Sequence, residues 1–294
     1  STLLNRLCGQ KIAIATPKPQ TTRRMIRGIV NGPDHQAVLL DTPGLHAPRN
    51  RLGQLMTRMT QEACDQADLV LLVADASRKA FDDAERRCLE RTNRNGTPLV
   101  VVFNKVDRIQ KERLLPRMAE AHAGYAPREI LPISALTGDG CDELLRILVR
   151  MLPEGPPIFD REAFTDETER SLSEEIIREH VLRQVRQEIP HGTGVLVASF
   201  EEEPLHDPPT GVSHPGGTAP DRFVRIAASI YCEKETHKGI LLGKGGSMIQ
   251  AIGTAARLEL EEMLQARVHL DLHIKVREDW RNRSAILRDL GFRG

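Results

Sequence analysis

Aromatic residues are scarce in this chain. Phenylalanine, tryptophan and tyrosine together make up 3% of its 294 residues, and only one tryptophan is present. This excludes a nucleic-acid surface built mainly on base stacking against aromatic rings, which needs several such rings. Long hydrophobic runs are missing too. The longest, residues 69–74 and 99–103, are much shorter than the ~20 residues of a membrane-spanning helix, so no transmembrane segment is expected.

Cysteine pairs and metal-ligand spacings are also absent. The five cysteines are odd in number, widely scattered and never spaced as CxxC, which excludes a disulfide framework and a zinc site. The ten histidines show no metal-ligand spacing. His269 and His273 lie four residues apart, but on a predicted strand, where a structural role fits better. We expect a reducing, cytoplasmic environment.

The chain has no net charge, because 41 basic side chains balance 41 acidic ones. The balance hides segments of different sign: residues 1–152 carry a net +6, residues 153–222 a net −9 and residues 223–294 a net +3. The acidic middle is typical of a solvated hinge or exposed helix. The neutral total gives no electrostatic argument for nucleic-acid binding by the chain as a whole.

The length suits two domains, because single domains cluster around ~100–200 residues. From residue 25 to 152, short hydrophobic runs alternate with amphipathic stretches of helical length, which predicts a doubly wound α/β domain with a parallel sheet. The expected strands are Met25–Val30, Gln36–Asp41, Asp68–Ala74, Pro98–Asn104 and Glu129–Ile133. The expected helices are Gly53–Asp65, Phe81–Asn93, Ile109–His122 and Cys141–Leu152.

A proline-rich stretch from Leu152 to Pro157 ends this alternation and predicts a linker. Beyond it we expect a compact α+β domain, with a loop over Pro204–Pro220, where proline and glycine are too frequent for regular structure. We place the first domain at residues 1–153, the linker at 154–173 and the second domain at 174–294. The helices expected there are Glu174–Gln187, Gly246–Ala266 and Ser284–Leu290, and the strands are Val195–Glu201, Phe223–Tyr231 and Val268–Val276.

Three motifs at predicted strand ends indicate a guanine-nucleotide site. Asp41-Thr42-Pro43-Gly44 matches D-x-x-G, in which the carboxylate holds magnesium through water and the glycine N–H contacts the γ-phosphate. Asn104-Lys105-Val106-Asp107 matches the more specific N-K-x-D, whose Asp accepts two hydrogen bonds from guanine while Lys covers the base and Asn ties the loops together. Ser134-Ala135-Leu136 supplies a backbone N–H for guanine O6. Adenine presents the wrong donor pattern, and leaving such polar groups unpaired is unfavourable.

The chain begins Ser1-Thr2 and runs directly into a predicted helix. A Ser-Thr pair at this place is typical of the end of G-x-x-x-x-G-K-[ST], where backbone N–H groups bind phosphates and the hydroxyl binds magnesium. A simple helix N-cap has the same pattern. Because the glycines and lysine of that loop are not in the sequence, we expect an N-terminally truncated GTPase that is weak or inactive as it stands.

These motifs, together with Gln20-Thr21-Thr22-Arg23, resemble the bacterial Era family of GTPases, and the resemblance extends to the end of the chain. It implies a P-loop GTPase domain that lacks its first strand and P-loop. It implies that GTP and GDP bind with Mg²⁺ at Ser1, Thr22 and Asp41 and with K⁺ beside the phosphates, and that Thr22 and Gly44 serve hydrolysis. Thr21 is the alternative to Thr22. Leu45 stands where many GTPases carry a water-positioning glutamine, so unaided hydrolysis should be slow.

Gly243-Lys244-Gly245-Gly246 precedes a long predicted helix and matches the G-x-x-G of a KH domain, whose tight loop between two helices lets the backbone approach RNA phosphates. Lys244 is placed to meet a phosphate. A plain turn shows the same four residues. The hydrophobic residues expected to form a floor under the bases are Ile240, Leu241, Leu242, Ile249 and Ile252.

The Era family carries a type II KH domain at this position. The resemblance therefore implies a single-stranded RNA ligand, the 3′ end of 16S ribosomal RNA, and a role in maturation of the 30S subunit. It also implies occasional peripheral association with the inner membrane. Two hypotheses stay open: a GTP-driven switch that controls RNA binding, or an RNA-binding assembly module whose nucleotide pocket is non-functional.

Overall fold

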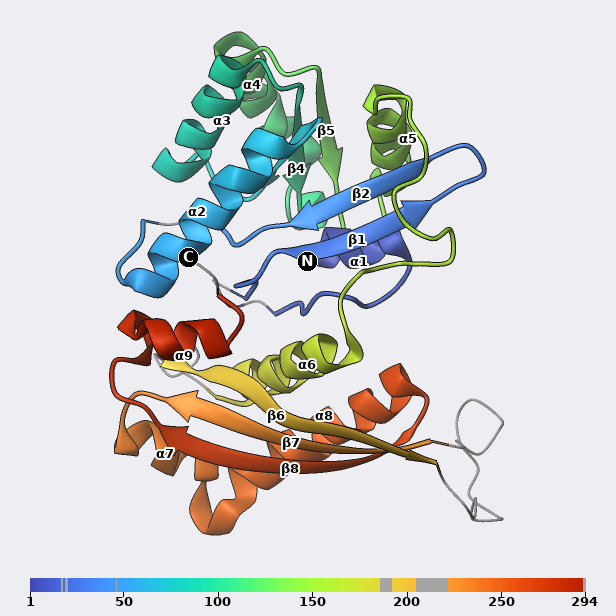
Figure 1. Ribbon diagram of the computed structural model, residues 1–294. Coiled ribbons are helices and arrows are strands. Elements are labelled where there is room, and N and C mark those ends of the chain that lie inside the picture. The colour runs from blue at the N-terminus through green and yellow to red at the C-terminus, as the bar shows by residue number, and fades with distance from the viewer. Residues whose placement is uncertain (17, 19–20, 46, 186–191, 205–221, 293–294) are drawn as a thin grey trace. The chain divides into compact units, whose positions relative to one another are not determined.

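Two compact units make up the computed structural model of the chain, which describes residues 1–16, 18, 21–45, 47–185, 192–204 and 222–292 (Figure 1). The first unit comprises Ser1–Ala13, Thr22–Arg49 and Gly53–Asp166, and the second comprises Ile14–Thr21, Asn50–Leu52 and Glu167–Gly294. None of the helices in the described ranges combines the length and the hydropathy that crossing a bilayer requires.

The first unit contains two small sheets. Strands β1 (Ile26–Asn31) and β2 (Gln36–Asp41) form an antiparallel pair, whereas β3 (Val70–Asp75), β4 (Leu99–Asn104) and β5 (Glu129–Ile133) form a parallel sheet in that order. The predicted parallel arrangement is thus wrong for the first pair. Only residues 32–35 connect β1 to β2, and so short a connection permits a hairpin but no parallel crossover.

Helix α1 (Thr2–Cys8) precedes the strands of this unit and α5 (Cys141–Met151) follows them. Between β2 and β5, the strands alternate with α2 (Arg51–Gln66), α3 (Asp83–Asn95) and α4 (Leu115–Tyr125). Helix α3 begins in a capping box, in which the Asp82 side chain accepts from the Glu85 N–H and the Glu85 side chain accepts from the Asp82 N–H. Helix α4 begins six residues later than predicted, because two short 3₁₀ turns precede it and Pro116 lies in its first turn.

Strand β4 is the centre of the first unit, since Val100, Val101, Val102 and Phe103 are all completely buried. Val101 and Phe103 pack into one hydrophobic cluster with residues of α3 and α4, and Val100 and Val102 pack into another with residues of α5. Helices therefore cover both faces of this sheet, as the doubly wound α/β class requires.

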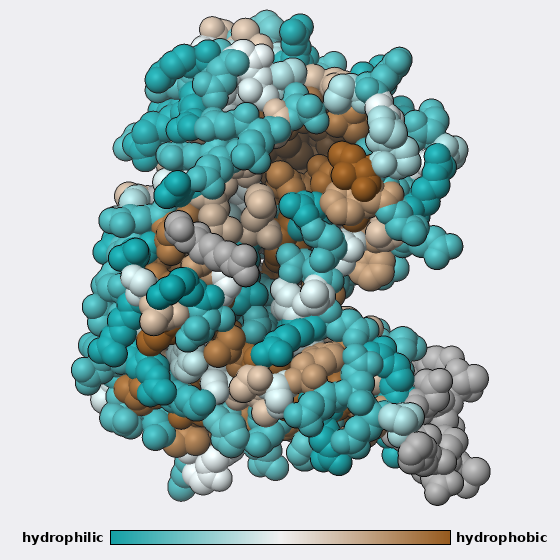
Figure 2. All heavy atoms as spheres, in the orientation of Figure 1, coloured by the Kyte–Doolittle hydropathy of each residue, from teal (hydrophilic) through white to brown (hydrophobic). Residues whose placement is uncertain are grey.

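Strand β3 lies at the edge of its sheet, and Val73 on this strand is 43% exposed. Figure 2 shows hydrophobic residues around a hollow in the first unit, while hydrophilic residues cover most of the visible surface. Other large hydrophobic side chains of this unit are exposed as well: Leu115, Leu136, Ile158 and Phe164.

The second unit is the predicted α+β domain, with a sheet in the order β6-β7-β8. Strands β6 and β7 are antiparallel, and β7 and β8 are parallel. Its strands are β6 (Gly194–Pro204), β7 (Arg222–Cys232) and β8 (Arg267–Val276), and its helices are α6 (Glu169–Gln184), α7 (Glu235–Leu242), α8 (Ser247–Leu264) and α9 (Ser284–Asp289).

Helix α6 begins five residues before the predicted start, because the Thr168 side chain caps it by accepting from the Ser171 N–H. Its predicted end at Gln187 lies outside the described residues. So does the predicted loop over Pro204–Pro220, apart from Pro204, which ends β6. Helix α7 was not among the residue ranges predicted from periodicity.

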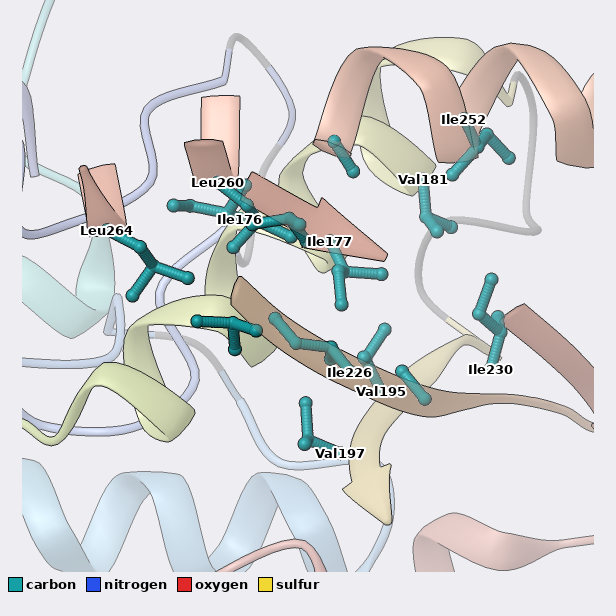
Figure 3. Packing of buried hydrophobic residues seen from close by; sticks show 14 of the residues in the cluster. Ile176, Ile177, Val181, Val195, Val197, Ile226, Ile230, Ile252, Leu260 and Leu264 are labelled. Atoms are coloured by element: carbon teal, nitrogen blue, oxygen red, sulfur yellow. The ribbon is translucent and has the colours of Figure 1, made fainter. Parts of the chain in front are cut away.

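The core of the second unit lies between its sheet and two helices (Figure 3). Ile176, Ile177 and Val181 of α6 lie in one cluster with Val195 and Val197 of β6. Ile252, Leu260 and Leu264 of α8 and Ile226 and Ile230 of β7 complete the same cluster. Helices α6 and α8 thus supply the helical side of this core.

Trp280, the sole tryptophan, anchors the end of the second unit. It is completely buried, and its Nε1–H donates a 2.9 Å hydrogen bond to Gly192 O. We expect Trp280→Ala to destabilise this unit by about 3–5 kcal/mol, the usual effect of truncating a buried aromatic ring. Urea unfolding followed by hydrogen exchange of the β6–β8 amides reads the second unit separately.

Trp280→Phe is the matched control, because it keeps a buried aromatic ring and removes the N–H that donates to Gly192 O. Leu258→Ala, at a side chain that is 56% exposed, gives the baseline for a surface change. If Trp280→Ala is no more destabilising than Leu258→Ala, the anchoring role of the tryptophan is wrong.

Candidate functional site

Three oxygen-bearing side chains converge in the first unit. Ser1 Oγ lies 2.7 Å from Thr22 Oγ1 and donates a 2.7 Å hydrogen bond to Asp41 Oδ2. Thr22 Oγ1 lies 3.1 Å from the same carboxylate oxygen. Ser1 immediately precedes α1, Thr22 precedes β1 and Asp41 ends β2, so three separate segments bring these groups together. They are the three residues that the sequence predicts as a metal site.

The structure distinguishes Thr22 from its neighbour. Thr21 Oγ1 donates to Lys18 O at 2.6 Å and lies 2.7 Å from Thr16 Oγ1, and it belongs to the second unit. Thr22 is 8% exposed and belongs to the first unit with Asp41. Of the two threonines that the sequence left open, Thr22 therefore meets the carboxylate. Gln20 of the Gln20-Thr21-Thr22-Arg23 motif lies outside the described residues.

In the D-x-x-G segment, Asp41 and Thr42 are followed by a proline that α2 holds and by an exposed glycine. Pro43 is buried, and its carbonyl accepts a 3.0 Å hydrogen bond from Thr60 Oγ1 of α2, whereas Gly44 is exposed. Leu45 packs against the hydrophobic cluster under β3 and β4. Position 45 thus supplies packing, and it has no polar group with which to orient a water molecule.

The N-K-x-D loop is tied to the Ser134 loop by side-chain hydrogen bonds. Asn104 Oδ1 accepts from the Lys105 N–H at 2.7 Å and from the Ala135 N–H at 2.9 Å. Ser134 Oγ donates to Asp107 Oδ1 at 2.6 Å. Ser134 is almost completely buried and Asp107 is exposed, so a buried hydroxyl orients an accessible carboxylate. The second carboxylate oxygen is left for a ligand.

The Ser134–Leu136 backbone is partly occupied by the protein itself. The Ser134 N–H donates to Asp139 O at 2.9 Å, and the Ala135 N–H donates to Asn104. A guanine O6 would therefore share the Ala135 N–H or take that of Leu136, whose side chain is 67% exposed. The sequence predicts a donor for guanine O6 somewhere in Ser134–Leu136, and these hydrogen bonds reduce the candidates to Ala135 and Leu136.

Asp75 and Arg6 belong to this region but were not among the residues predicted from the sequence. Asp75 Oδ2 accepts a 2.7 Å hydrogen bond from Lys105 Nζ. Arg6 of α1 donates through Nε to Ala135 O at 3.3 Å and through its NH2 group to Leu136 O at 2.6 Å. Asp75 ends β3, and its position at the carboxyl end of a parallel strand was a usable signal. Arg6 carried no signal, because only the packing of α1 brings it to this loop.

Lys105 and Asp75 form a partly exposed ion pair, with the lysine side chain 45% and the aspartate side chain 22% exposed. Partial burial would raise the pKa of Asp75, but hydrogen bonds from Lys105 and Ser77 outweigh it and lower that pKa to about 2. Lys105 also adopts a left-handed backbone with φ of 72°. Asp75 thus stays ionised at neutral pH and holds the lysine stem at the edge of the loop.

The G-x-x-G segment of the second unit forms the sharp connection between α7 and α8. Gly243, Gly245 and Gly246 all have positive φ values, of 71°, 62° and 83°. A Cβ atom at Gly243 would lie 2.8 Å from Met248 Cβ, whereas none of the surrounding atoms lies within 4 Å of one at Gly245 or Gly246. Gly243 closes the turn, and the other two face open space beside the exposed Lys244.

The predicted hydrophobic floor of this site is smaller than expected. Leu241 and Ile252 are completely buried in the core of the second unit, so they cannot meet a base. Ile240 is 46% and Leu242 is 38% exposed, and Ile249 is half-buried. The helical period explains the difference, because it turns one residue in three or four inward on each of α7 and α8.

Comparison with known protein families gives one match in each unit of the chain. A family described as 50S ribosome-binding GTPase matches residues 1–105, and a KH domain family matches residues 217–281. GTPase Era from Geobacter metallireducens is 42% identical over 292 residues, covering 99% of this chain and 93% of the relative. The chain belongs to the Era GTPase family. GTPase Era from Ruminiclostridium cellulolyticum, 39% identical, spans 100% of this chain and 93% of its own length.

Solved Era structures have the same fold. A variant of Aquifex aeolicus Era bound to GDP and AlF4⁻ superimposes with a TM-score of 0.89 at 33% identity, covering 99% of this chain and 94% of that chain. Era in complex with MgGDPNP and nucleotides 1506–1542 of 16S ribosomal RNA matches with the same score, identity and coverage. The Era resemblance and the predicted combination of a GTPase fold with a KH domain are confirmed.

Proposed function

We propose that this chain is a GTP-binding and GTP-hydrolysing switch that binds the 3′ end region of 16S ribosomal RNA and assists maturation of the 30S subunit. The observation that carries the proposal is the pair of motifs in the first unit: the oxygen cluster of Ser1, Thr22 and Asp41, and the carboxylate of Asp107 oriented by Ser134. One suits a metal-bound phosphate, and the other suits guanine.

The oxygen cluster fits Mg²⁺, because two hydroxyls and a carboxylate are the hard ligands that this ion prefers. Ser1, Thr22 and Asp41 would hold it, directly or through water. When bound, Mg²⁺ neutralises the charge that develops on the phosphate oxygens. Each hydroxyl would exchange its present hydrogen bond for the ion.

Discrimination of guanine falls to the N-K-x-D loop. The carboxylate of Asp107 would accept from guanine N1–H on one oxygen and from the exocyclic amine on the other, while Ser134 Oγ donates to Oδ1. Asn104 fixes the distance between this loop and the backbone that would meet O6. Lys105 would cover the base with its stem while Asp75 retains its ammonium group.

Hydrolysis would use Thr22 and the N–H of Gly44 at the γ-phosphate. Because Leu45 cannot orient water, we propose that K⁺ beside the phosphates supplies further positive charge. GTP hydrolysis faster in potassium chloride than in sodium chloride of equal concentration is the expected result. Equal rates in the two salts would contradict the potassium proposal alone.

Binding of RNA would use the loop Gly243–Gly246 and the hydrophobic residues beside it. Lys244 would pair with a phosphate, and Ile240 and Ile249 would contact bases. The related Era structure with bound 16S ribosomal RNA supports this assignment. The exposed loop has space for a backbone to approach closely, since Gly245 and Gly246 carry no side chain.

We expect Thr22→Ala to lower Mg²⁺-dependent GTP hydrolysis by at least on the order of 10-fold, because removal of a group that holds a metal in place has effects of 10–100-fold. Thr21→Ala is the matched control, since that hydroxyl bonds to Lys18 and Thr16 instead. Phosphate release is measured in an extended version of the chain, in which a glycine-rich loop and lysine precede Ser1. Equal loss in the two variants would contradict the assignment of Thr22.

We also propose a cytoplasmic location with peripheral association at the inner membrane, supported by the Era resemblance alone. Co-sedimentation with vesicles of phosphatidylethanolamine and phosphatidylglycerol tests it. Recovery of the protein only in the supernatant, at low as well as physiological salt, would contradict the membrane part.

The proposal as a whole is tested by measuring GTP hydrolysis and binding of a labelled 16S 3′-end RNA by the extended version. We expect hydrolysis, RNA binding, and RNA affinity that differs between the GDPNP and GDP states. RNA binding without nucleotide binding would favour the alternative, an RNA-binding assembly module with a non-functional nucleotide pocket.

A further inference from the structure

Arg117 on α4 is a buried charge outside the nucleotide site. The residue is 5% exposed, and its guanidinium carbon lies 4.6 Å from the ring centre of Phe103 on β4 and 5.2 Å from that of Phe81. Both distances are within the ~6 Å at which a guanidinium is attracted to an aromatic face. The positive charge of Arg117 is therefore held against the hydrophobic interior of the first unit.

The hydrogen bonds of Arg117 all go to one turn. Its NH1 group donates to Asp75 O and to Arg78 O, both at 2.8 Å. In the part of the chain that the structure describes, its Nε and NH2 atoms are buried and have no hydrogen-bond partner. Burying a charge with unpaired donors is unfavourable, and a hydrocarbon side chain of similar size would avoid this cost. Stability alone therefore does not account for an arginine at this place.

The turn that Arg117 contacts comes directly after β3 and touches the N-K-x-D motif. The Arg78 N–H donates to Asp75 O at 3.2 Å, and the Ala76 N–H donates to Asn104 O at 2.8 Å. Because both bonds from Arg117 end on backbone carbonyls, they fix the main chain of the turn rather than one side chain. The backbone of Asp75 is thus positioned by α4 as well as by its neighbours.

The side chain of Asp75 extends this arrangement to the nucleotide site. Its Oδ1 accepts from the Ser77 N–H at 2.9 Å and from Ser77 Oγ at 2.6 Å, and its Oδ2 accepts from Lys105 Nζ at 2.7 Å. Both carboxylate oxygens are therefore held. Where Lys105 lies depends on where the turn places this carboxylate.

We propose that Arg117 is a positioning residue for guanine-nucleotide binding, which fixes the Asp75–Arg78 turn so that Asp75 holds Lys105 over the base. Arg117 acts through these two residues, and its burial keeps it away from the ligand. The last step of this inference rests on the proposed nucleotide function, because Lys105 makes the contact with the base. The first step, from Arg117 to the turn, concerns the chain alone.

The first step is tested on the chain itself with Arg117→Met, which removes the guanidinium and keeps a long side chain in the buried space. We expect faster amide hydrogen exchange at Ala76 and Arg78, followed by NMR, with unchanged exchange in α5. Arg113→Met is the matched control, because it makes the same change at an exposed arginine just before α4. Unchanged exchange at both turn amides in Arg117→Met would overturn the proposal.

The second step is tested by a double-mutant cycle on GDP affinity in the extended version. Arg117→Met should weaken GDP binding on the order of 10-fold, because two hydrogen bonds from a charged group no longer fix the turn. Lys105→Ala should weaken it too, and the double variant should bind GDP as Lys105→Ala does, since both changes act through one lysine. A merely structural effect of Arg117→Met would add to that of Lys105→Ala, so additive losses would overturn the proposal.

Arg117→Lys is the conservative variant, because an ammonium group can donate to the two carbonyls but lacks the planar guanidinium. It should recover part of the GDP affinity that Arg117→Met loses, and it replaces Arg117→Met in both measurements if that variant fails to fold. If the unaltered extended version binds no GDP, the proposed function fails and the last step of the inference fails with it. Faster exchange at Ala76 and Arg78 would still support the hold of Arg117 on the turn.

Discussion

Asp107→Asn is expected to reverse the base preference of the nucleotide site. The affinity for GTP should fall on the order of 10²- to 10⁴-fold, since two hydrogen bonds to a charged group, at about 1.5–3 kcal/mol each, are lost. The affinity for xanthosine triphosphate should rise, because its extra carbonyl accepts a hydrogen bond from the new amide. Competition against a fluorescent nucleotide in the extended version measures both affinities.

Asp107→Asn should change the hydrogen bonding to the base without disturbing the rest of the loop. Ser134 Oγ donates to Asp107 Oδ1, so the oxygen of an asparagine amide can keep that bond. The amide nitrogen then takes the position that faces the base. Asp107 is exposed, and the change therefore leaves the core intact.

Ser134→Ala is the companion variant, because it frees the carboxylate without changing its charge. We expect a smaller loss of GTP affinity and an unchanged preference for guanine over xanthine. Retention of full GTP preference by Asp107→Asn would overturn the assignment of the guanine site.

Gly245→Asp is expected to weaken RNA binding on the order of 10- to 100-fold, with nucleotide affinity unchanged. An aspartate there places a negative charge beside Lys244, where an RNA phosphate is expected, and like charges brought together in an interface are unfavourable by several kcal/mol. Fluorescence anisotropy with a labelled single-stranded RNA of the 16S 3′ end measures the loss. Because the effect is electrostatic, it should shrink at higher salt.

Gly245→Asn separates charge from backbone strain. Gly245 has φ of 62° and ψ of 23°, and asparagine and aspartate tolerate this left-handed conformation to a similar degree. Open space surrounds an added Cβ atom in both cases. If the Asp and Asn variants bind RNA equally well, the loop does not contact phosphate.

Short-range chemistry made much of the fold predictable. Strands β2 and β5 match their predicted ranges residue for residue, because turn and charged residues bound each short hydrophobic run. The motif residues lie at strand ends, where neighbouring parallel strands bring them together, and Asn104 and Ala135 meet for this reason. The antiparallel β1–β2 pair shows the limit, because a run of hydrophobic residues does not record strand direction.

Contacts between distant segments were not predictable in the same way. Arg6 reaches the Ser134 loop only through helix packing, which no spacing in the sequence encodes. Leu241 and Ile252 were assigned to an RNA-binding floor because they flank the glycine loop, but the helical turn buries them. Composition identified hydrophobic residues correctly, and only the fold decides which of them face solvent.

The central claim is that this chain carries the guanine-nucleotide site of an Era-type switch. The most direct measurement is binding of fluorescent GDP and GTP, in Mg²⁺ and K⁺, to the chain itself and to the extended version. We predict tight binding by the extended version, displaced by GTP and not by ATP. Absence of tight binding by both proteins would contradict the claim and leave the RNA-binding assembly module as the function.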